Sequence, residues 1–134
     1  MDSQAERHPA MWNELARLTN SARTHLNRHA GLHVASLDIT TTTRSAGRVE
    51  VYVSGRCPQA CRRLLDWADT LADPSLCLQI EDNPLQPKAM LFGQFGDGVR
   101  TTVTAPLAED DVACVPGDKV GEWVLHWLRM QTVD

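Results

Sequence analysis

The sequence predicts an α+β protein: an antiparallel sheet of about five strands together with three helices, in the order α-β-β-α-β-β-β-α. Two observations carry this prediction. Apolar residues recur every three or four positions in three segments, as along one side of a helix, and alternate with polar residues in the segments between. In addition, Asp97-Gly98 separates two alternating segments, and Asp-Gly between strands is a strong hairpin signal.

The three predicted helices each carry one apolar stripe. The first covers 12–29, follows a proline suited to a first turn, and ends at Gly31. The second covers 58–72 and stops at the Asp-Pro pair that comes next. The third covers 118–128, and the side chain of Asp118 is expected to cap its first turn.

The predicted strands are short and joined mainly by hairpins. In the second of them, valines alternate with Glu50, Tyr52 and Ser54, which predicts one buried face and one wet face. The polar run 40–48 is expected to be a hairpin loop. Because hairpins join antiparallel strands, we expect an antiparallel sheet with helices on one face. The strands are predicted over 32–39, 49–53, 76–80, 89–95 and 99–105.

Length and composition favour one ordinary globular domain over 1–134, with 1–8 as a flexible N-terminal tail. The chain has 134 residues, of which 43% are apolar and 22% charged, enough for a single core. We find neither an apolar run of roughly 20 residues, as a membrane span requires, nor a secretory leader. We therefore expect a cytoplasmic protein whose four cysteines are reduced thiols.

Charge is divided unevenly along the chain. Residues 1–65 hold nine arginines and five acidic residues, a net charge of +4, whereas residues 66–134 hold four basic and twelve acidic residues, a net charge of −8. Such an asymmetry steers encounters with charged partners without naming any chemistry.

Part of the second half resembles a known group of proteins. The residues that carry the resemblance are the string Leu64 to Leu71 (Leu-Leu-Asp-Trp-Ala-Asp-Thr-Leu), the hairpin Phe95 to Val99, and Val115-Pro116 followed by Val120 and Trp123. They look like a group of small uncharacterised proteins of streptomycetes and related actinobacteria. The chain departs from that group over 75–88, where a Trp-Arg-Pro stretch is expected. The resemblance implies a source and supports the fold, and it brings no activity, cofactor or catalytic residue.

The cysteines offer the one candidate for thiol chemistry. Cys57 and Cys61 follow a predicted strand and open a helix, where the helix dipole favours a thiolate. Redox pairs use Cys-x-x-Cys, however, and Cys61 also fits the buried helix face. Zinc would need Cys77 and Cys114 as well, without the paired spacing of a finger or ribbon. We expect structural thiols here, with a thiol or metal-dependent enzyme as the least favoured hypothesis.

The histidines and hydroxyls give no catalytic constellation. His25 and His29 share a helix face at i, i+4, but no glutamate completes a metalloprotease motif, so a solvated helix face is the preferred interpretation. The sequence has no Gly-x-Ser-x-Gly elbow and no phosphate-binding glycine loop. The chain is therefore expected to be non-enzymatic, with no catalytic residue, no cofactor and no metal.

Nucleic-acid binding is the alternative that the N-terminal arginines raise. Arg17, Arg28, Arg62 and Arg63 would contact phosphates if they shared one surface. The second half has the element order of a double-stranded-RNA-binding domain. It lacks that domain's lysine cluster at the start of the last helix, and its net charge of −8 would repel phosphate.

Tryptophan dominates the aromatic residues. We expect Trp12, Trp123 and Trp127 to anchor the core. Trp67 lies off the apolar stripe of its helix, so it is expected to be partly exposed and to anchor a protein contact together with Arg62, Arg63 and Asp66. The leading hypothesis is thus a protein-interaction module or accessory protein with a charge-asymmetric surface, and a homodimer is one form of this hypothesis.

Overall fold

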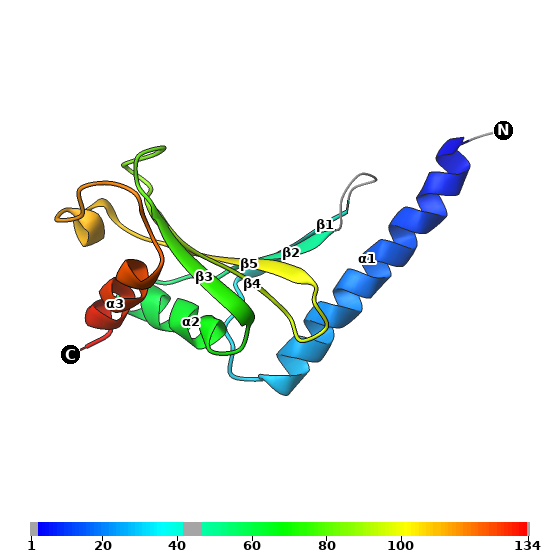
Figure 1. Cartoon of the computed structure of the whole chain (residues 1–134), viewed down its shortest axis with the longest axis horizontal. Helices are drawn as coiled ribbons and strands as arrows, with labels where there is room; N and C mark the ends of the chain where they lie inside the picture. Colours follow the sequence, from blue (N-terminus) through cyan, green and yellow to red (C-terminus); the bar gives the residue numbers. More distant parts are fainter. Residues whose placement is uncertain (1–2, 42–46, 134) are drawn as a thin grey trace.

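One six-stranded sheet and three α-helices make up the described part of the chain (Figure 1). The computed structural model describes residues 3–41 and 47–133. The predicted class, α+β with the order α-β-β-α-β-β-β-α, is confirmed, with a 3-10 turn and a two-residue strand added before the last helix. The elements are α1 (Ser3–Arg28), β1 (Ser36–Thr40), β2 (Arg48–Tyr52), α2 (Gln59–Ala68), β3 (Ala72–Gln79), β4 (Lys88–Gln94), β5 (Arg100–Pro106), η1 (Glu109–Val112), β6 (Lys119–Val120) and α3 (Glu122–Gln131).

The sheet is mixed, so the prediction of a purely antiparallel sheet is wrong. Its strand order is β1-β2-β5-β4-β3-β6, and β2 pairs with β5 in parallel while all other pairs are antiparallel. The reason is the link through α2, because a helical crossover lets the chain leave β2 and return to the sheet further along. The meander β3-β4-β5 then folds back until β5 lies beside β2.

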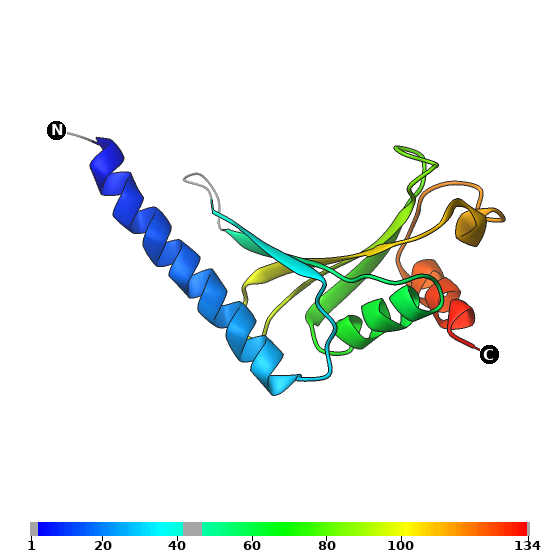
Figure 2. The ribbon, with the colours of Figure 1, turned by 180° about the vertical axis from the view of Figure 1, so that it is seen from behind.

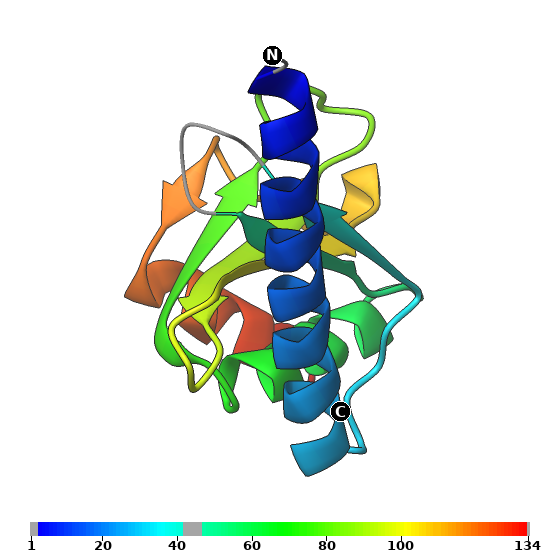
Figure 3. The same cartoon turned by 90° about the vertical axis from the view of Figure 1, so that its right-hand side faces the viewer.

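Helix α1 differs most from its prediction. It begins at Ser3, so residues 3–8 belong to the helix rather than to a flexible tail, and Pro9 lies in its second turn. At 26 residues it spans about 39 Å, at roughly 1.5 Å per residue. Its N-terminal half extends beyond the sheet (Figures 1 and 3). The predicted loop over 40–48 lies for the most part outside the described residues.

Two predicted helix boundaries are also corrected. Helix α2 ends at Ala68, and the Asp73-Pro74 pair lies inside β3 at an irregularity of the β3–β4 register, where Asp73 has φ 50°. Asp118 does not cap α3. Its Oδ1 instead accepts hydrogen bonds from the backbone N–H groups of Ile80 and Glu81, at 2.6 and 3.0 Å, and Gly121 occupies the N-cap position.

The core lies between one face of the sheet and the helices. Helices α2 and α3 lie together on this side, while α1 crosses the end of the sheet (Figures 1 and 2). Alternating residues of each strand point into the core, as the apolar pattern predicts. The largest fully buried side chains include Leu78, Leu91, Val49, Val51 and Val103 from the sheet, and Leu18, Leu64, Trp67, Val124 and Leu128 from the helices.

A buried histidine joins α1 to α2 and to the β4–β5 turn. The ring of His25 stacks on Phe95 and on Trp67, with centroids 4.6 and 5.7 Å apart, and its Nε2 lies 2.9 Å from Thr70 Oγ1. The Thr70 hydroxyl donates to the Trp67 carbonyl, so the histidine Nε2 donates to Thr70. The solvated helix face predicted for His25 is therefore wrong, because its ring completes an aromatic cluster.

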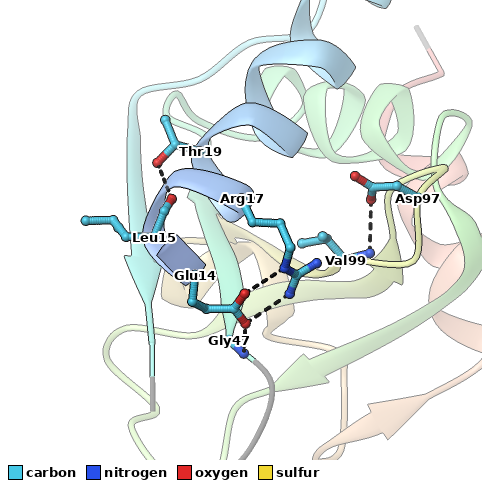
Figure 4. Close-up of polar contacts among 7 residues, drawn as sticks. All are labelled: Glu14, Leu15, Arg17, Thr19, Gly47, Asp97 and Val99. Carbon is cyan, nitrogen blue, oxygen red and sulfur yellow. Dashed lines mark hydrogen bonds and ion pairs between the residues drawn. The ribbon is translucent and has the colours of Figure 1, made fainter. Parts of the chain in front are cut away.

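A polar contact fixes α1 to the start of β2. The Glu14 carboxylate accepts two hydrogen bonds from Arg17, at 2.6 and 2.9 Å, and one from the backbone N–H of Gly47, at 3.4 Å (Figure 4). These bonds help to hold the pKa of Glu14 below its ordinary value, with the Arg17 bond as the main cause. A side chain at Gly47 would collide with the backbone oxygen of Thr40, so glycine is required for this close approach.

Candidate functional site

The face of the sheet opposite the core carries no helix among the described residues. We call it the open face. Because strand register aligns side chains across a sheet, its residues fall into rows that run from one edge toward the other. The first row is Val120, Cys77, Met90, Thr104, Tyr52 and Ser36; the second is Ser75, Phe92, Thr102, Glu50 and Asp38; the third is Gln94, Arg100, Arg48 and Thr40.

The second and third rows line a hollow of about 850 Å³. Phe92 and Ser75 lie on one side of it, and Arg48 and Arg100 on the other, with Asp73 at the irregular start of β3. Pockets of this size hold small ligands or protruding side chains of a partner. The lining residues Gln94 and Arg100 lie at the strand ends next to the β4–β5 turn, which α1 contacts through His25 and Phe95.

Two arginines stand side by side in the third row. Arg48 and Arg100 are direct register partners on neighbouring parallel strands, and both are exposed. The Glu50 carboxylate pairs with Arg48 at 2.9 Å. Arg100 has neither an ion pair nor a side-chain hydrogen bond within residues 3–41 and 47–133. Like charges in register destabilise a sheet, so this placement favours binding of a carboxylate or another anion over stability.

Glu50 links the first row to the third. Its Oε2 accepts a hydrogen bond from the Tyr52 hydroxyl at 3.2 Å, while Oε1 pairs with Arg48. Burial, followed by the nearby charge of Glu50, raises the pKa of Tyr52 above its ordinary value, so this hydroxyl stays protonated and able to donate at neutral pH. Asp38 lies opposite Glu50 as a second acidic group on this face.

Exposed apolar side chains lie among these charges. Phe92 is 41% exposed at the centre of the face, and Val120 is 76% exposed at its edge. Met90 and Tyr52, between them, are half-buried. A face with an aromatic centre, an apolar residue at its β6 edge and both signs of charge has the composition of a protein-binding surface.

Trp67 does not lie at the surface, where we expected it to anchor a protein contact. Trp67 is fully buried, and its indole N–H donates to the His33 carbonyl at 2.9 Å, so it cannot anchor a partner. Its neighbours do remain on the surface: Arg62, Arg63 and Asp66 line a shallow hollow with residues 31–33. The helix wheel predicted exposure of Trp67 wrongly because α2 is covered on two sides, by the sheet and by the segment after α1.

Trp12 and Trp123 also depart from the prediction, whereas Trp127 packs against the core as expected. Trp12 is 68% exposed on the part of α1 that extends beyond the sheet, and Trp123 is 44% exposed beside Lys119, whose Nζ lies 5.5 Å from the ring centroid. Trp127 is half-buried against the core. The residue expected at the surface is therefore the one fully buried tryptophan, and Trp12, expected in the core, is the most exposed.

The four arginines of the nucleic-acid alternative are not brought together. Arg17 is occupied by Glu14, and Arg28 lines a hollow with Asp97 at the β4–β5 turn (Figure 4 shows Arg17 and Asp97). Arg62 and Arg63 lie elsewhere and donate to backbone carbonyls, Arg63 to Ser54 at 2.7 Å and Arg62 to Thr132 at 3.3 Å.

The cysteines separate into one pair and two single residues. Cys61 is fully buried and its Sγ lies 3.5 Å from that of Cys57, while Cys77 lies on the open face and Cys114 is exposed after η1. Over the described part of the chain, no three His, Cys, Asp or Glu side chains meet in a geometry that would hold a metal ion.

The charge asymmetry of the sequence has a counterpart in space. Acidic residues gather at the end of the sheet away from α1: Glu81 and Asp82 in the β3–β4 loop, Asp118 beside them, and 109–111 in η1 (Figures 1 and 2). We call this group the acidic end. The paired arginines of the open face lie toward the opposite end.

The residues that sequence reasoning missed are Arg48, Arg100 and Phe92. Strand alternation placed Glu50 and Tyr52 on a wet face, and this prediction is confirmed. The same alternation would have put Arg48 beside them. That Arg100 stands next to Arg48 follows only from the parallel β2–β5 pairing, which no local pattern reveals.

Comparisons with protein-family models, with curated proteins and with solved structures found no match to this chain. The resemblance to actinobacterial proteins therefore stays a prediction. None of the helices in residues 3–41 and 47–133 has both the length and the apolar character needed to cross a bilayer.

Proposed function

We propose that this chain is a non-enzymatic protein-interaction module that works without a cofactor and whose contact surface is the open face. The observation that carries the proposal is Phe92, 41% exposed in a hollow beside the register pair Arg48 and Arg100, on a face that no described helix covers. Burying the phenyl ring and giving Arg100 an acidic partner would each favour association.

A second copy of the chain is the partner that the charges support best. The acidic end of one copy complements the arginines of another, and a two-fold arrangement of facing sheets would satisfy both contacts at once. The acids on the open face itself, Asp38 and Glu50, make it less suited to a phosphate backbone. Nucleic-acid binding through Arg17, Arg28, Arg62 and Arg63 therefore ranks second.

Sedimentation over a range of protein concentrations tests self-association. We expect a dimer at low salt that weakens at high salt, because screening acts on exposed charges. The double variant Phe92→Ser/Arg100→Ser should stay monomeric. The matched control is Met130→Ser/Arg129→Ser, which removes an exposed apolar residue and an exposed arginine from α3 and should associate like the wild type.

Charge reversal makes this test specific for the contact. Arg48→Glu/Arg100→Glu and Glu109→Lys/Asp110→Lys should each abolish association alone, and an equimolar mixture of the two should restore it. If the mixture stays monomeric while the wild type dimerises, the arginines and the acidic end do not meet.

A wild type that is monomeric at every concentration removes the second copy as the partner. Proteins captured from the source cells would then be compared between wild type, the Phe92→Ser/Arg100→Ser variant and the α3 control. A partner lost only with the open-face variant supports the proposal with a different protein. Capture that is the same for all three overturns it, and a mobility shift of duplex DNA or RNA at low salt would favour the alternative.

A further inference from the structure

The two sulfur atoms of Cys57 and Cys61 are in direct contact, and the proposed function does not use them. Cys61 Sγ, in the first turn of α2, donates to Cys57 Sγ across 3.5 Å, and Cys57 directly precedes Pro58, the N-cap of that helix. A disulfide needs a sulfur separation of about 2.05 Å, so the thiols are about 1.5 Å from bonding distance. We propose that this pair is a redox modification site, which closes to an intramolecular disulfide by exchange with a low-molecular-weight disulfide such as oxidised glutathione.

Exposure sets the order in which the two thiols react. Cys57 is half-buried, so a small disulfide reaches it from solvent, whereas Cys61 is fully buried and reaches nothing except Cys57. Cys57 is therefore the attacking thiol and Cys61 the resolving thiol. In this order, the buried sulfur never has to meet the oxidant.

The exchange balances in two steps. The Cys57 thiolate attacks one sulfur of oxidised glutathione, which forms a mixed disulfide and releases one glutathione thiolate. The Cys61 thiolate then attacks the Cys57 sulfur, which forms the intramolecular disulfide and releases the second glutathione. The two thiol protons end on the two glutathione molecules, so the protein loses two hydrogens and two electrons, and the glutathione disulfide gains them.

The surroundings predict that this closure is slow at neutral pH and faster at higher pH. Burial raises the pKa of both thiols, and for Cys57 the hydrogen bond from Cys61 offsets part of the effect. The thiolate fraction is thus small at neutral pH. Proximity favours the second step once the first has occurred, because the two sulfurs are already in contact.

The remaining cysteines have no such partner. Neither Cys77 nor Cys114 contacts another cysteine sulfur in the described residues; Cys77 Sγ accepts a hydrogen bond from Gln79 at 3.9 Å, and Cys114 is exposed. An exposed thiol without a resolving neighbour should stop at the mixed disulfide. Both residues are therefore replaced by serine in the test below, so that any adduct or disulfide comes from Cys57 and Cys61.

Closure has a structural consequence at α3. The Cys57 thiol lies 3.9 Å from the Gln131 side-chain oxygen in the last turn of α3, and oxidation removes the hydrogen that it donates. The oxidation state should therefore be visible at the α2–α3 contact, far from the open face. This inference stands independently of the proposed function.

Mass spectrometry of the folded full-length chain carrying Cys77→Ser and Cys114→Ser tests the proposal. After incubation with oxidised glutathione, we expect a protein that has lost two hydrogens and holds no glutathione, with a changed NMR signal for the Gln131 side-chain amide. Three results would overturn the inference: a stable glutathione adduct on Cys57, a disulfide between two chains, or thiols that oxidise only after unfolding in urea.

Two further variants, made in the chain that carries Cys77→Ser and Cys114→Ser, distinguish the attacking thiol from the resolving thiol. Cys61→Ala should stop at the glutathione adduct on Cys57, and Cys57→Ser should remain unmodified because Cys61 is buried. Should Cys61→Ala fail to fold, the Cys57→Ser result still decides the order, since modification of Cys61 in that folded variant contradicts it.

Discussion

The two faces of the sheet differ although the same strands supply both. On the covered face, Leu91, Val51 and Val103 are fully buried against the helices. On the open face, their strand neighbours Phe92 and Glu50 remain accessible beside two arginines in register. The covered face is arranged for stability, and the open face tolerates like-charge neighbours that lower stability. This contrast is the basis of our proposal that the open face is the contact surface.

Substitutions at two adjacent residues of β4 should give the largest difference in the free energy of unfolding. Leu91→Ala should lower the free energy of unfolding by about 2–5 kcal/mol, because it leaves a cavity in the core. Phe92→Ala should lower it by about 1 kcal/mol or less, since the ring is already partly in water. Urea unfolding of both variants measures the difference. Equal losses would show that something covers the open face in solution.

The packing of His25 on the covered side should also make the stability of the protein depend on pH. Burial lowers the pKa of His25, and the charges of His29 and Arg28 act in the same direction, against a weaker opposing effect of Asp97. Below the unfolded-state value of about 6.5, the unfolded chain binds a proton that the folded protein does not. Stability should therefore be complete above that pH and decrease as pH falls toward the lower folded value.

Unfolding free energies from about pH 7.5 to about pH 5.5 test this dependence. His25→Gln should flatten the curve, and His126→Gln, at an exposed position of α3, should leave its shape unchanged. An unchanged slope in His25→Gln would mean that His25 is protonated equally in both states.

The smallest expected effect is a gain in stability, whereas most substitutions lower stability. Arg100→Thr should raise the free energy of unfolding by a few tenths of a kcal/mol, because it removes a like-charge neighbour of Arg48 and places a β-branched residue in a strand. The same change should weaken association. Thermal unfolding at low salt detects the gain, and a loss above about 1 kcal/mol would show that Arg100 supports the fold instead.

Much of the fold was predictable from local pattern, and the site was not. Apolar periodicity located all three helices and all five longer strands, since side-chain spacing directly reflects backbone geometry. The parallel β2–β5 pair was missed because it depends on how α2 carries the chain across the sheet.

The tryptophans also show what local sequence pattern does not predict. A helix wheel for α2 placed Trp67 off the buried stripe, yet the segment around His33 covers it from a second side. Trp12 looked like a core residue, yet α1 extends past the sheet at that point. Exposure of a large side chain depends on which distant segments reach it, and no local spacing carries that information.

Backbone NMR of the free chain, compared between dilute and concentrated samples, tests the central claim most directly. We predict that amide signals of open-face residues such as Phe92, Arg100 and Thr102 shift with concentration, while signals of α2 and α3 stay in place. Signals that shift only around Trp12 or along α3, or that do not shift at all while the protein associates, would contradict the open face as the contact surface.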